Sequence, residues 1–461
     1  LEEMGEDDRV ALLAELEGER AADVLGEMDP DDAADLLREV GSEKAKVLLD
    51  LMDEEDAEDV RRLMHYEDYS AGCTSTSDSS TTETAAPAAA KCDAPILIGA
   101  AMAQTGFMSP FDGPALTTAQ IAVDKINAAG GVNGCQLKLE AVDTETNPDK
   151  GQQIATDFVS KGAKLLLVTC DYDINAKSSQ VANNAGVLVI APCVGSTAMG
   201  PDNGLNLGFS LGSAVPGEAA IMAEYAYEKI GKSATLFKDM SIAYTTSQCD
   251  AFEARFKELG GTVKSVQQFS QTQAGKLDKP VTAQVANAKK DGASVIALCS
   301  YPGGGAEAAA SIRGAGVKTP IISGFGMDGA FWLGAVPNLN DYYVVTYASV
   351  FGDDPNPKVT ELLDAFKTKT GNPAATSGLI TGASSVEAFA IAAERAKSFD
   401  GAALAAEMEK FKSEDLTAGP TSFSPELHVN VTRPMAVLKI TGGKDAFVEY
   451  RAAQKPTFPT K

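Results

Sequence analysis

Two glycine-containing segments carry residue types found in active sites. Gly208–Gly212, read as GFSLG, matches the G-x-S-x-G pattern in which a serine on a sharp turn after a buried strand attacks an acyl group. Ser210 would need a histidine as its base, and His428 is the candidate, since His65 lies in a segment of different character. The residues before Gly208 are polar and glycine-rich, so a serine hydrolase is the weaker hypothesis.

The second segment, Gly324–Gly329, matches the G-x-G-x-x-G pattern of dinucleotide-binding turns and lies between an expected strand and an expected helix. It comes far along the chain rather than at the first strand of its region, which disfavours nucleotide binding. With two histidines and no cluster of metal-ligating side chains in the main body, we expect no metal and no other cofactor. These features favour a binding protein over an enzyme.

The chain has seven cysteines, all from residue 73 onward. With Cys73 set aside as a candidate lipid site, six remain, an even number suited to an oxidising compartment. They stand at the ends of expected neighbouring strands or at a helix start. We therefore predict the disulfides Cys92–Cys135, Cys170–Cys193 and Cys249–Cys299, while other pairings and a reduced, buried state stay open.

Short apolar runs alternate with amphipathic helical patterns from residue 92 onward, which indicates doubly wound parallel sheets. The expected strands are 96–101, 165–168, 187–190, 294–298 and 321–323. The expected helices are 117–129, 148–160, 218–230, 252–259 and 306–314. About 370 residues exceed the usual core of one sheet, so we expect an α/β fold with two lobes joined by a hinge. No stretch approaches the roughly 18 consecutive apolar residues of a membrane helix.

The net charge of −25 is concentrated at the amino end. Residues 1–70 hold 25 acidic and 7 basic residues, and their leucine doublets recur at short intervals, as in a small array of helices. Nucleic acid is not an expected partner, because phosphate binding requires a basic face. The acidic run 53–59 fits a solvated helix face, with weak divalent-cation binding as the alternative.

Residues 73–91 are rich in Ser, Thr and Ala and indicate a flexible linker. Such a segment after a cysteine is typical of a mature bacterial lipoprotein, and the residues 70–73, SAGC, resemble a lipobox with Ser70 in place of an apolar residue. Only acidic helical sequence precedes it, without the apolar region of a signal peptide, so export of this chain as it stands is not predicted. A natural fusion, cloning or sequence assembly could each have joined the two parts.

The sequence of the amino-terminal array, LLAELEGERAADVLGEMDPDDAADLLREV, resembles the cytosolic N-terminal domain of MgtE-type magnesium channels. The resemblance covers residues 1–72 and includes none of the membrane helices of that family. It implies a small, acidic, all-α domain that does not itself transport magnesium.

The segment that starts at residue 94, APILIGAAMAQTGFMSPFDGPALTTAQIAVDKINAAGGVNG, resembles type I periplasmic binding proteins for branched-chain amino acids and amides. The likeness continues to about residue 445. It implies lobe 1 at about 92–211 and 348–420, and lobe 2 at about 212–347 and 421–461. It also implies an extracytoplasmic substrate-binding protein, periplasmic or a cell-surface lipoprotein, that delivers a solute to the permease of an ABC importer. A ligand sensor of a signalling system is the alternative.

In that family an amino acid lies between the lobes, and its carboxylate meets helix starts after the third and fourth strands, where unpaired N–H groups favour anions. The positions that match are Tyr172, Asp173, Ser196 and Thr197 in lobe 1. In lobe 2, Tyr244 and Tyr301 match aromatic positions of the family, with ordinary packing as their alternative role, and Asp328 is the candidate partner of a ligand ammonium. Asp171 and Asp173 depart from the family, because carboxylates repel an anionic ligand unless they face away.

Overall fold

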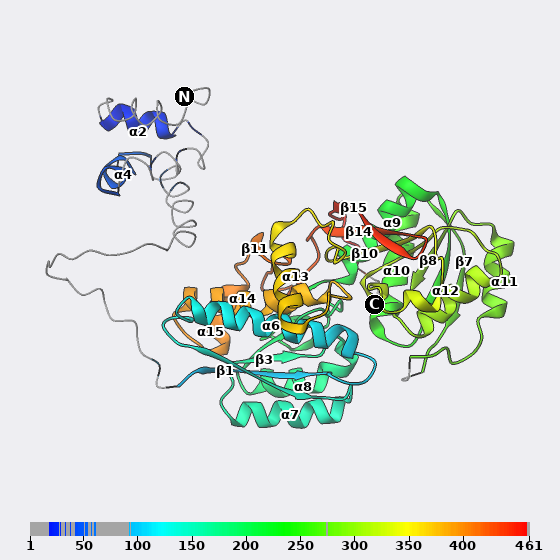
Figure 1. Ribbon diagram of the computed structural model, residues 1–461, viewed down its shortest axis with the longest axis horizontal. Helices are drawn as coiled ribbons and strands as arrows, with labels where there is room; N and C mark the ends of the chain where they lie inside the picture. Colours follow the sequence, from blue (N-terminus) through cyan, green and yellow to red (C-terminus); the bar gives the residue numbers. More distant parts are fainter. Residues whose placement is uncertain are drawn as a thin grey trace. The chain divides into compact units, whose positions relative to one another are not determined.

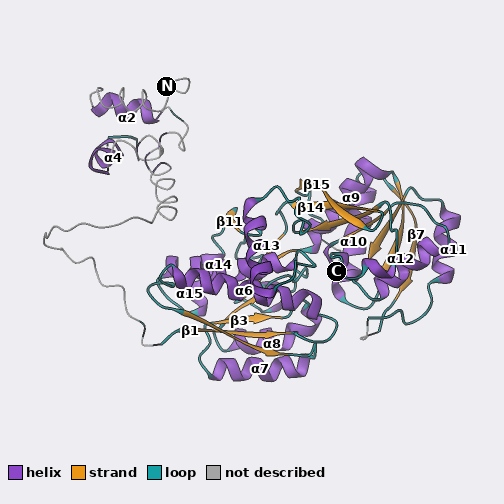
Figure 2. Ribbon diagram, in the orientation of Figure 1, coloured by secondary structure: helices purple, strands orange, loops and turns teal. Residues whose placement is uncertain are grey.

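The computed structural model describes residues 18–26, 28, 33, 37, 42–49, 51–53, 57, 60, 92, 94–272 and 275–458. The chain divides into two compact units, Leu1–Ala86 and Pro87–Lys461. Figures 1 and 2 show the helices and strands of both units.

The first unit contains helices α2 (Gly18–Gly26) and α4 (Ser42–Leu49) among its described residues. Small and branched apolar side chains form its core, among them Ala21, Leu25, Leu37, Leu48 and Val60. Asp53 is exposed, while the rest of the acidic run, the linker and Cys73 lie outside the described residues.

The second unit begins with a parallel sheet of six strands in the order β13-β5-β4-β3-β1-β2. Its strands are β1 (Ile96–Met102), β2 (Leu137–Asp143), β3 (Leu165–Val168), β4 (Leu188–Ala191), β5 (Gly208–Ser213) and β13 (Val429–Asn430). The helices beside it are α6 (Ser109–Ala128), α7 (Pro148–Ser160), α8 (Tyr172–Asn184), α13 (Pro357–Thr370), α14 (Gly378–Ala396) and α15 (Gly401–Met408). Figure 1 shows α7 and α8 on one face of the sheet and α6, α14 and α15 on the other.

Alternating side chains of each strand enter different cores, because successive residues of a strand point to opposite faces. Leu165 and Leu167 pack with the helices α6 and α14, whereas Leu166 and Val168 pack with α7 and α8. All four side chains of β3 are buried. The uninterrupted apolar run LLLV is therefore what a parallel strand covered on both faces requires.

The second sheet has seven strands in the order β15-β14-β10-β9-β8-β6-β7. Its strands are β6 (Ser233–Asp239), β7 (Thr262–Phe269), β8 (Val295–Cys299), β9 (Ile321–Ser323), β10 (Tyr342–Thr346), β14 (Met435–Thr441) and β15 (Lys444–Arg451). The helices beside it are α9 (Val215–Tyr225) with the π-turn η2 (Ala226–Ile230), α10 (Ala243–Glu258), α11 (Thr282–Asp291) and α12 (Gly304–Gly314). Short 3-10 turns lie at η1 (Pro201–Asn203), η3 (Phe325–Met327) and η4 (Leu333–Ala335), and a small hairpin joins β11 (Glu414–Leu416) to β12 (Gly419–Thr421).

The two-lobed α/β fold is confirmed, with two differences in detail. Strands β14 and β15 are antiparallel and close through Gly442 and Gly443, whose φ angles of 60° and 74° suit a tight hairpin. Residues 421–430 belong to the first lobe rather than the second, because β13 pairs with β5. The boundary expected at 420/421 therefore falls between β13 and β14. The short strand β13, Val429–Asn430, was not among the expected strands.

All three expected disulfides are present in the structure, Cys92–Cys135, Cys170–Cys193 and Cys249–Cys299. Cys170 and Cys193 follow the neighbouring strands β3 and β4, and their Cα atoms are 4.8 Å apart. The pair ties together the two loops that follow these strands.

We predict that peptide mapping without reductant recovers these three pairs from protein purified under oxidising conditions, because each pair joins sites that the fold already holds within bonding range. Alkylation under denaturing conditions is the control for free thiols. Four or more reactive thiols among the six cysteines would contradict the prediction.

Candidate ligand-binding cleft

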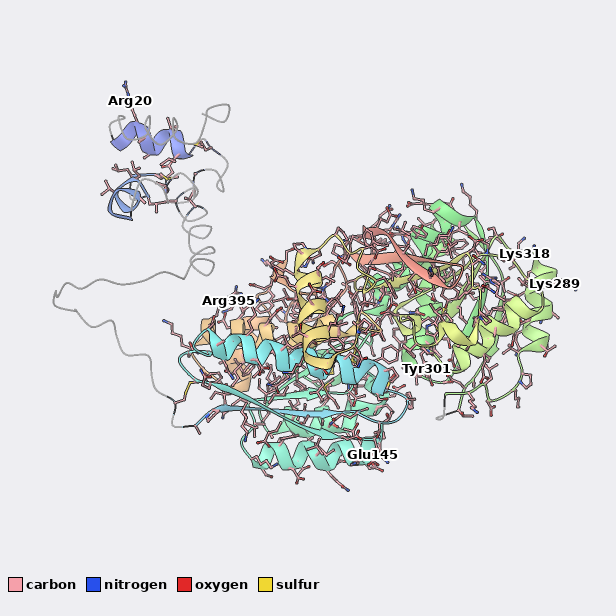
Figure 3. The ribbon with its side chains drawn as sticks, viewed as in Figure 1. Arg20, Glu145, Lys289, Tyr301, Lys318 and Arg395 are labelled. Carbon is pink, nitrogen blue, oxygen red and sulfur yellow. A yellow bond between two sulfur atoms is a disulfide. The ribbon has the colours of Figure 1, made fainter. Side chains whose placement is uncertain are left out.

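A cleft lies where loops of both lobes meet. Its first-lobe lining consists of Met108, Phe111, Cys170, Asp171, Tyr172, Asp173, Cys193, Val194, Gly195 and Ser196. Its second-lobe lining consists of Ile242, Ala243, Tyr244, Tyr301, Phe325 and Gly326. Figure 3 labels Tyr301, which lies between the two lobes.

The lining residues follow the carboxyl ends of strands in both sheets. In the first lobe they come after β1, β3 and β4, and in the second after β6, β8 and β9. In α/β sheets ligands bind at this edge, where loops are free to vary while the strands fix their starting points. The geometry therefore defines a ligand site that both lobes share.

A buried carboxylate holds the first-lobe loops in place. Asp112, at the start of α6, accepts hydrogen bonds from the backbone N–H groups of Ala103 (2.7 Å) and Cys170 (2.9 Å). These groups lie just after β1 and β3, so one side chain fixes both loops. Its neighbour Phe111 then contributes an aromatic wall of the cleft.

In the second lobe, Glu218 fixes the ring of Tyr244. The Tyr244 hydroxyl donates to Glu218 Oε1 at 2.8 Å and accepts from Gln248 Nε2 at 2.7 Å and from the N–H of Gly326 at 3.0 Å. The hydroxyl has one proton and two lone pairs, and all three are used. Tyr244 therefore offers a ligand the face of its ring rather than its hydroxyl.

The lobes touch each other around the cleft. Asp173 Oδ2 accepts a hydrogen bond from the N–H of Ala243 at 2.9 Å, and this bond joins α8 to α10. The rings of Phe107 and Tyr301 are 5.9 Å apart, and those of Phe111 and Phe325 are 5.5 Å apart. These contacts describe a closed arrangement of the two lobes.

Five of the seven ligand-contact residues expected from the sequence line this cleft, namely Tyr172, Asp173, Ser196, Tyr244 and Tyr301. Thr197 is next to the lining but not part of it. Asp328 is also outside it, which corrects its expected role as the partner of an ammonium. The Asp328 carboxylate is buried and accepts from the N–H and hydroxyl of Ser377 at 2.6 and 2.8 Å, so it anchors α14 instead.

The two helix starts expected after β3 and β4 differ. Helix α8 does begin at Tyr172, but no helix begins at Ser196, where the chain turns irregularly until η1. Gly195 instead packs against the Tyr244 ring, since a Cβ atom on Gly195 would lie 2.8 Å from Tyr244 Cδ2. The close approach of the lobes at this point therefore requires glycine.

The G-x-S-x-G segment does not have the geometry of a hydrolase active site. Ser210 lies within β5, is fully buried and donates to the carbonyl of Val194 at 2.7 Å. His428 stacks on Phe209 and bonds the Gly208 carbonyl and Glu409, so it is not a base for Ser210.

The N–H groups of the second glycine segment are also engaged. The N–H of Phe325 donates to Glu218 Oε1 at 2.5 Å, and that of Gly326 donates to the Tyr244 hydroxyl. A dinucleotide-binding turn would aim such groups at a pyrophosphate. Here they bind the side chains that support the cleft.

A second cavity lies near the crossovers between the lobes. Its lining is Tyr347, Pro355, Asn356, Val359, Ile380, Thr417, Ala418, Gly419, Pro420, Pro434 and Tyr450. None of the residues expected to bind a ligand is among them.

Several residues of the site were not anticipated. Phe111 and Met108 follow β1 in the segment GFMSPFD, where clustered aromatic and apolar residues beside a turn were the available signal. Glu218 is one of two acids in the otherwise apolar helix VPGEAAIMAEY, and all residues of α9 are buried. A carboxylate in such a helix indicates a buried polar contact.

Burial raises the pKa values of Asp112, Asp171 and Glu218 to about 7. In the unfolded chain these groups titrate near pH 4. Between about pH 4 and pH 7 the folded protein therefore keeps protons on these groups that the unfolded chain has lost. Proton binding stabilises the folded state at low pH, and this stabilisation is lost as the pH rises through about 7.

We predict that the thermal unfolding midpoint falls between pH 5.5 and pH 8.5, because all three shifts act in the same direction. Differential scanning calorimetry at constant ionic strength measures it. A midpoint that rises across this interval would show that the pKa values of these carboxyl groups are not raised in the folded state.

Comparisons with known proteins agree with this geometry. Residues 95–445 match the family described as periplasmic binding protein, and residues 1–69 match the MgtE intracellular N domain. A Leu/Ile/Val-binding protein homolog 3 from Brucella melitensis is 27% identical over 337 residues, which cover 72% of this chain and 88% of the relative. A leucine-, isoleucine-, valine-, threonine- and alanine-binding protein from Pseudomonas aeruginosa is 24% identical over 262 residues, 55% of this chain and 66% of the relative.

Among solved structures, the fold resembles the branched-chain amino acid transporter substrate-binding protein LivJ from Streptococcus pneumoniae in complex with isoleucine. The TM-score is 0.68 with 22% identity, over 78% of this chain and 99% of that one. For a leucine-binding protein from Thermotoga maritima the TM-score is 0.66 with 20% identity, over 77% of this chain and 99% of that one. Both comparisons establish the fold.

The fold and the cleft thus define a two-lobed solute-binding protein. The chain belongs to the periplasmic binding protein family, since the match covers most of its length. Members of this family bind solutes outside the cytoplasm and are not enzymes. Among the described residues, no helix is long and apolar enough to cross a membrane.

Proposed function

We propose that the second unit binds a small amino-acid-like or amide solute in the cleft and presents it to the permease of an ABC importer. The observation that carries this proposal is the cleft itself, which has aromatic walls from both lobes and a few polar groups at strand ends. Such sites bury the body of a small ligand and orient its polar end. The names of the Brucella and Pseudomonas relatives support an amino-acid-like solute.

The closed arrangement supports a hinge mechanism. Asp173 and Ala243 meet across the cleft, and so do Phe107 and Tyr301. These contacts can form only after the lobes approach, so a bound solute that touches both lobes would favour the closed state. The permease would then distinguish loaded from empty protein by the distance between the lobes.

We place this binding unit on the outer side of the cytoplasmic membrane, anchored through a lipid on Cys73. Three disulfides support an oxidising compartment, and the Ser/Thr/Ala-rich segment after Cys73 suits a tether. Mass spectrometry of the membrane-extracted protein tests the anchor. A diacylglyceryl mass on the peptide that begins at Cys73 is expected, and an unmodified peptide from that fraction would refute it.

A thermal-shift screen tests the proposed binding activity. The panel contains the common L-amino acids, their amides, short-chain aliphatic amides, urea and small carboxylates. A ligand at 100 times its Kd stabilises the folded state by about 2.7 kcal/mol, which raises the melting temperature by a clearly measurable amount. The proposal expects at least one strong hit, confirmed by calorimetry with one site per chain. A panel without any hit would refute it.

The amino-terminal unit is not needed for binding in this account. All lining residues of the cleft belong to the unit Pro87–Lys461. We predict that removal of residues 1–91 leaves the Kd of the best solute within about threefold, because separate units fold around their own cores. Calorimetry on both proteins measures this. A tenfold or greater loss of affinity would mean that the first unit contributes to the site.

A further inference from the structure

The charged side chains that line the cleft are both acidic. Among its described lining residues, Asp171 and Asp173 are the charged ones, and no Lys, Arg or His lines it. Asp173 is exposed and bonds across to the second lobe, but Asp171 is only 6% exposed. An anionic group of a solute would therefore approach a buried carboxylate without a positive charge to offset it.

Asp171 also occupies the anion site at the start of α8. Its Oδ1 accepts from the N–H groups of Asp173 at 2.8 Å and Ile174 at 3.3 Å, which are among the groups that a free helix start offers to a bound anion. The chain thus supplies its own carboxylate at the position where a solute carboxylate would otherwise bind.

The second oxygen of Asp171, Oδ2, has no hydrogen-bond donor among the described residues. This oxygen is not among the fully buried side-chain atoms that lack a partner, so it is open to a donor from a ligand. Nearby, the Ser196 hydroxyl accepts only from the N–H of Ala198 at 3.2 Å, so its proton remains for an acceptor on a ligand. The cleft therefore offers an acceptor at Asp171 and a donor at Ser196.

We propose that this cleft selects solutes that bring an N–H donor to Asp171 and carry no free carboxylate, that is, amides and amines with an apolar body. An amide satisfies both groups, with its NH₂ toward Asp171 and its carbonyl oxygen toward Ser196. Phe111, Phe325 and the ring face of Tyr244 enclose the apolar part. This inference rests on the proposed solute binding and narrows its chemical class.

Four solutes with the same branched body separate the polar groups. L-leucine has an ammonium and a carboxylate, L-leucinamide has an amine and an amide, 4-methylpentanoate has only a carboxylate, and 4-methylpentanamide has only an amide. Calorimetry on the full chain at pH 8 should give each amide at least a tenfold lower Kd than its carboxylate counterpart. If another solute leads the thermal-shift screen, its own amide and carboxylate forms are compared in the same way.

The outcomes distinguish this inference from the function on which it rests. Carboxylates that bind as tightly as the amides, or more tightly, overturn the inference and leave solute binding intact. No binding by any solute of either panel overturns both.

Replacement of the carboxylate tests Asp171 directly. Asp171→Asn keeps an oxygen that caps α8 but removes the negative charge, because asparagine is an equally good N-cap. The ratio of carboxylate Kd to amide Kd should fall at least tenfold in this variant. An unchanged ratio would overturn the assignment.

The chain contains a matched control. Asp400 caps α15 in the same way, with its Oδ1 accepting from the N–H groups of Ala402 and Ala403, both at 3.1 Å. It does not line the cleft. Asp400→Asn should leave the Kd ratio unchanged, and a change there equal to that of Asp171→Asn would also overturn the assignment. If Asp171→Asn does not fold, the carboxylate and amide Kd values of the unaltered chain still test whether the cleft prefers amides.

Discussion

Valine in place of Gly195 should weaken solute binding by a factor of 100 or more while both lobes stay folded. A Cβ atom at Gly195 would lie 2.8 and 2.9 Å from Tyr244 Cδ2 and Cε2, closer than such atoms approach in proteins. The Tyr244 ring cannot turn away easily, because Glu218, Gln248 and the Gly326 N–H hold its hydroxyl. The lobes would therefore be kept apart, and a solute would lose its contacts with one of them.

Calorimetry with the best solute of the screen measures this loss, and circular dichroism checks the fold. Gly314→Ala is the control, since Gly314 is exposed and a Cβ atom there meets nothing within 4 Å. A Gly195→Val variant with nearly normal affinity would contradict the closed geometry of the cleft. A variant that fails to fold would contradict the expectation that both lobes stay folded without this contact.

Alanine in place of Asp112 should lower the free energy of unfolding by about 2–6 kcal/mol, since it leaves two buried N–H groups, those of Ala103 and Cys170, without an acceptor. Each orphaned group costs about 1–3 kcal/mol. Binding should also suffer, because Cys170 precedes Asp171 in the cleft. Urea denaturation at pH 6 measures the change in stability.

Asp364→Ala is the control for that measurement. Asp364 is an exposed aspartate on α13. Its replacement should change stability by no more than about 0.5 kcal/mol, as is usual for surface positions. A loss below about 1 kcal/mol for Asp112→Ala would mean that the two loops find other partners, and Asp112 would then not hold the first-lobe side of the cleft.

The sequence allowed the regular parts of the fold to be predicted closely. The strands at 165–168 and 321–323 and the helix at 148–160 have the bounds found in the structure. Buried apolar runs define these strands, and the side chain of Asn147 accepts from the first N–H groups of α7, which fixes the start of that helix. Sequence patterns within a few residues are enough to predict such elements.

Elements that depend on distant contacts were predicted less well. Helix α6 begins at Ser109 rather than at 117, and it includes Gly113 and Pro114. Tertiary contacts override these helix breakers, since Phe111 is buried beside Phe325 and Asp112 bonds to the loops after β1 and β3. Neither contact is visible from residues close in the sequence.

The site shows the same division. The tyrosines and Ser196 could be predicted, because a family resemblance places them after particular strands. The support of Tyr244 by Glu218 could not, since the two residues lie on different helices and meet only when α9 and α10 pack together. For Asp328 the sequence suggested an ammonium partner, but its carboxylate faces Ser377 and not the cleft.

A crystal structure of the protein with the best solute of the screen would show where the solute binds. We expect one solute in the cleft between the lobes, with its body against Tyr244 and Tyr301 and its polar end within hydrogen-bond distance of Asp171 and Ser196. A solute bound instead in the cavity between Pro355, Pro420 and Pro434, with the cleft empty, would contradict it.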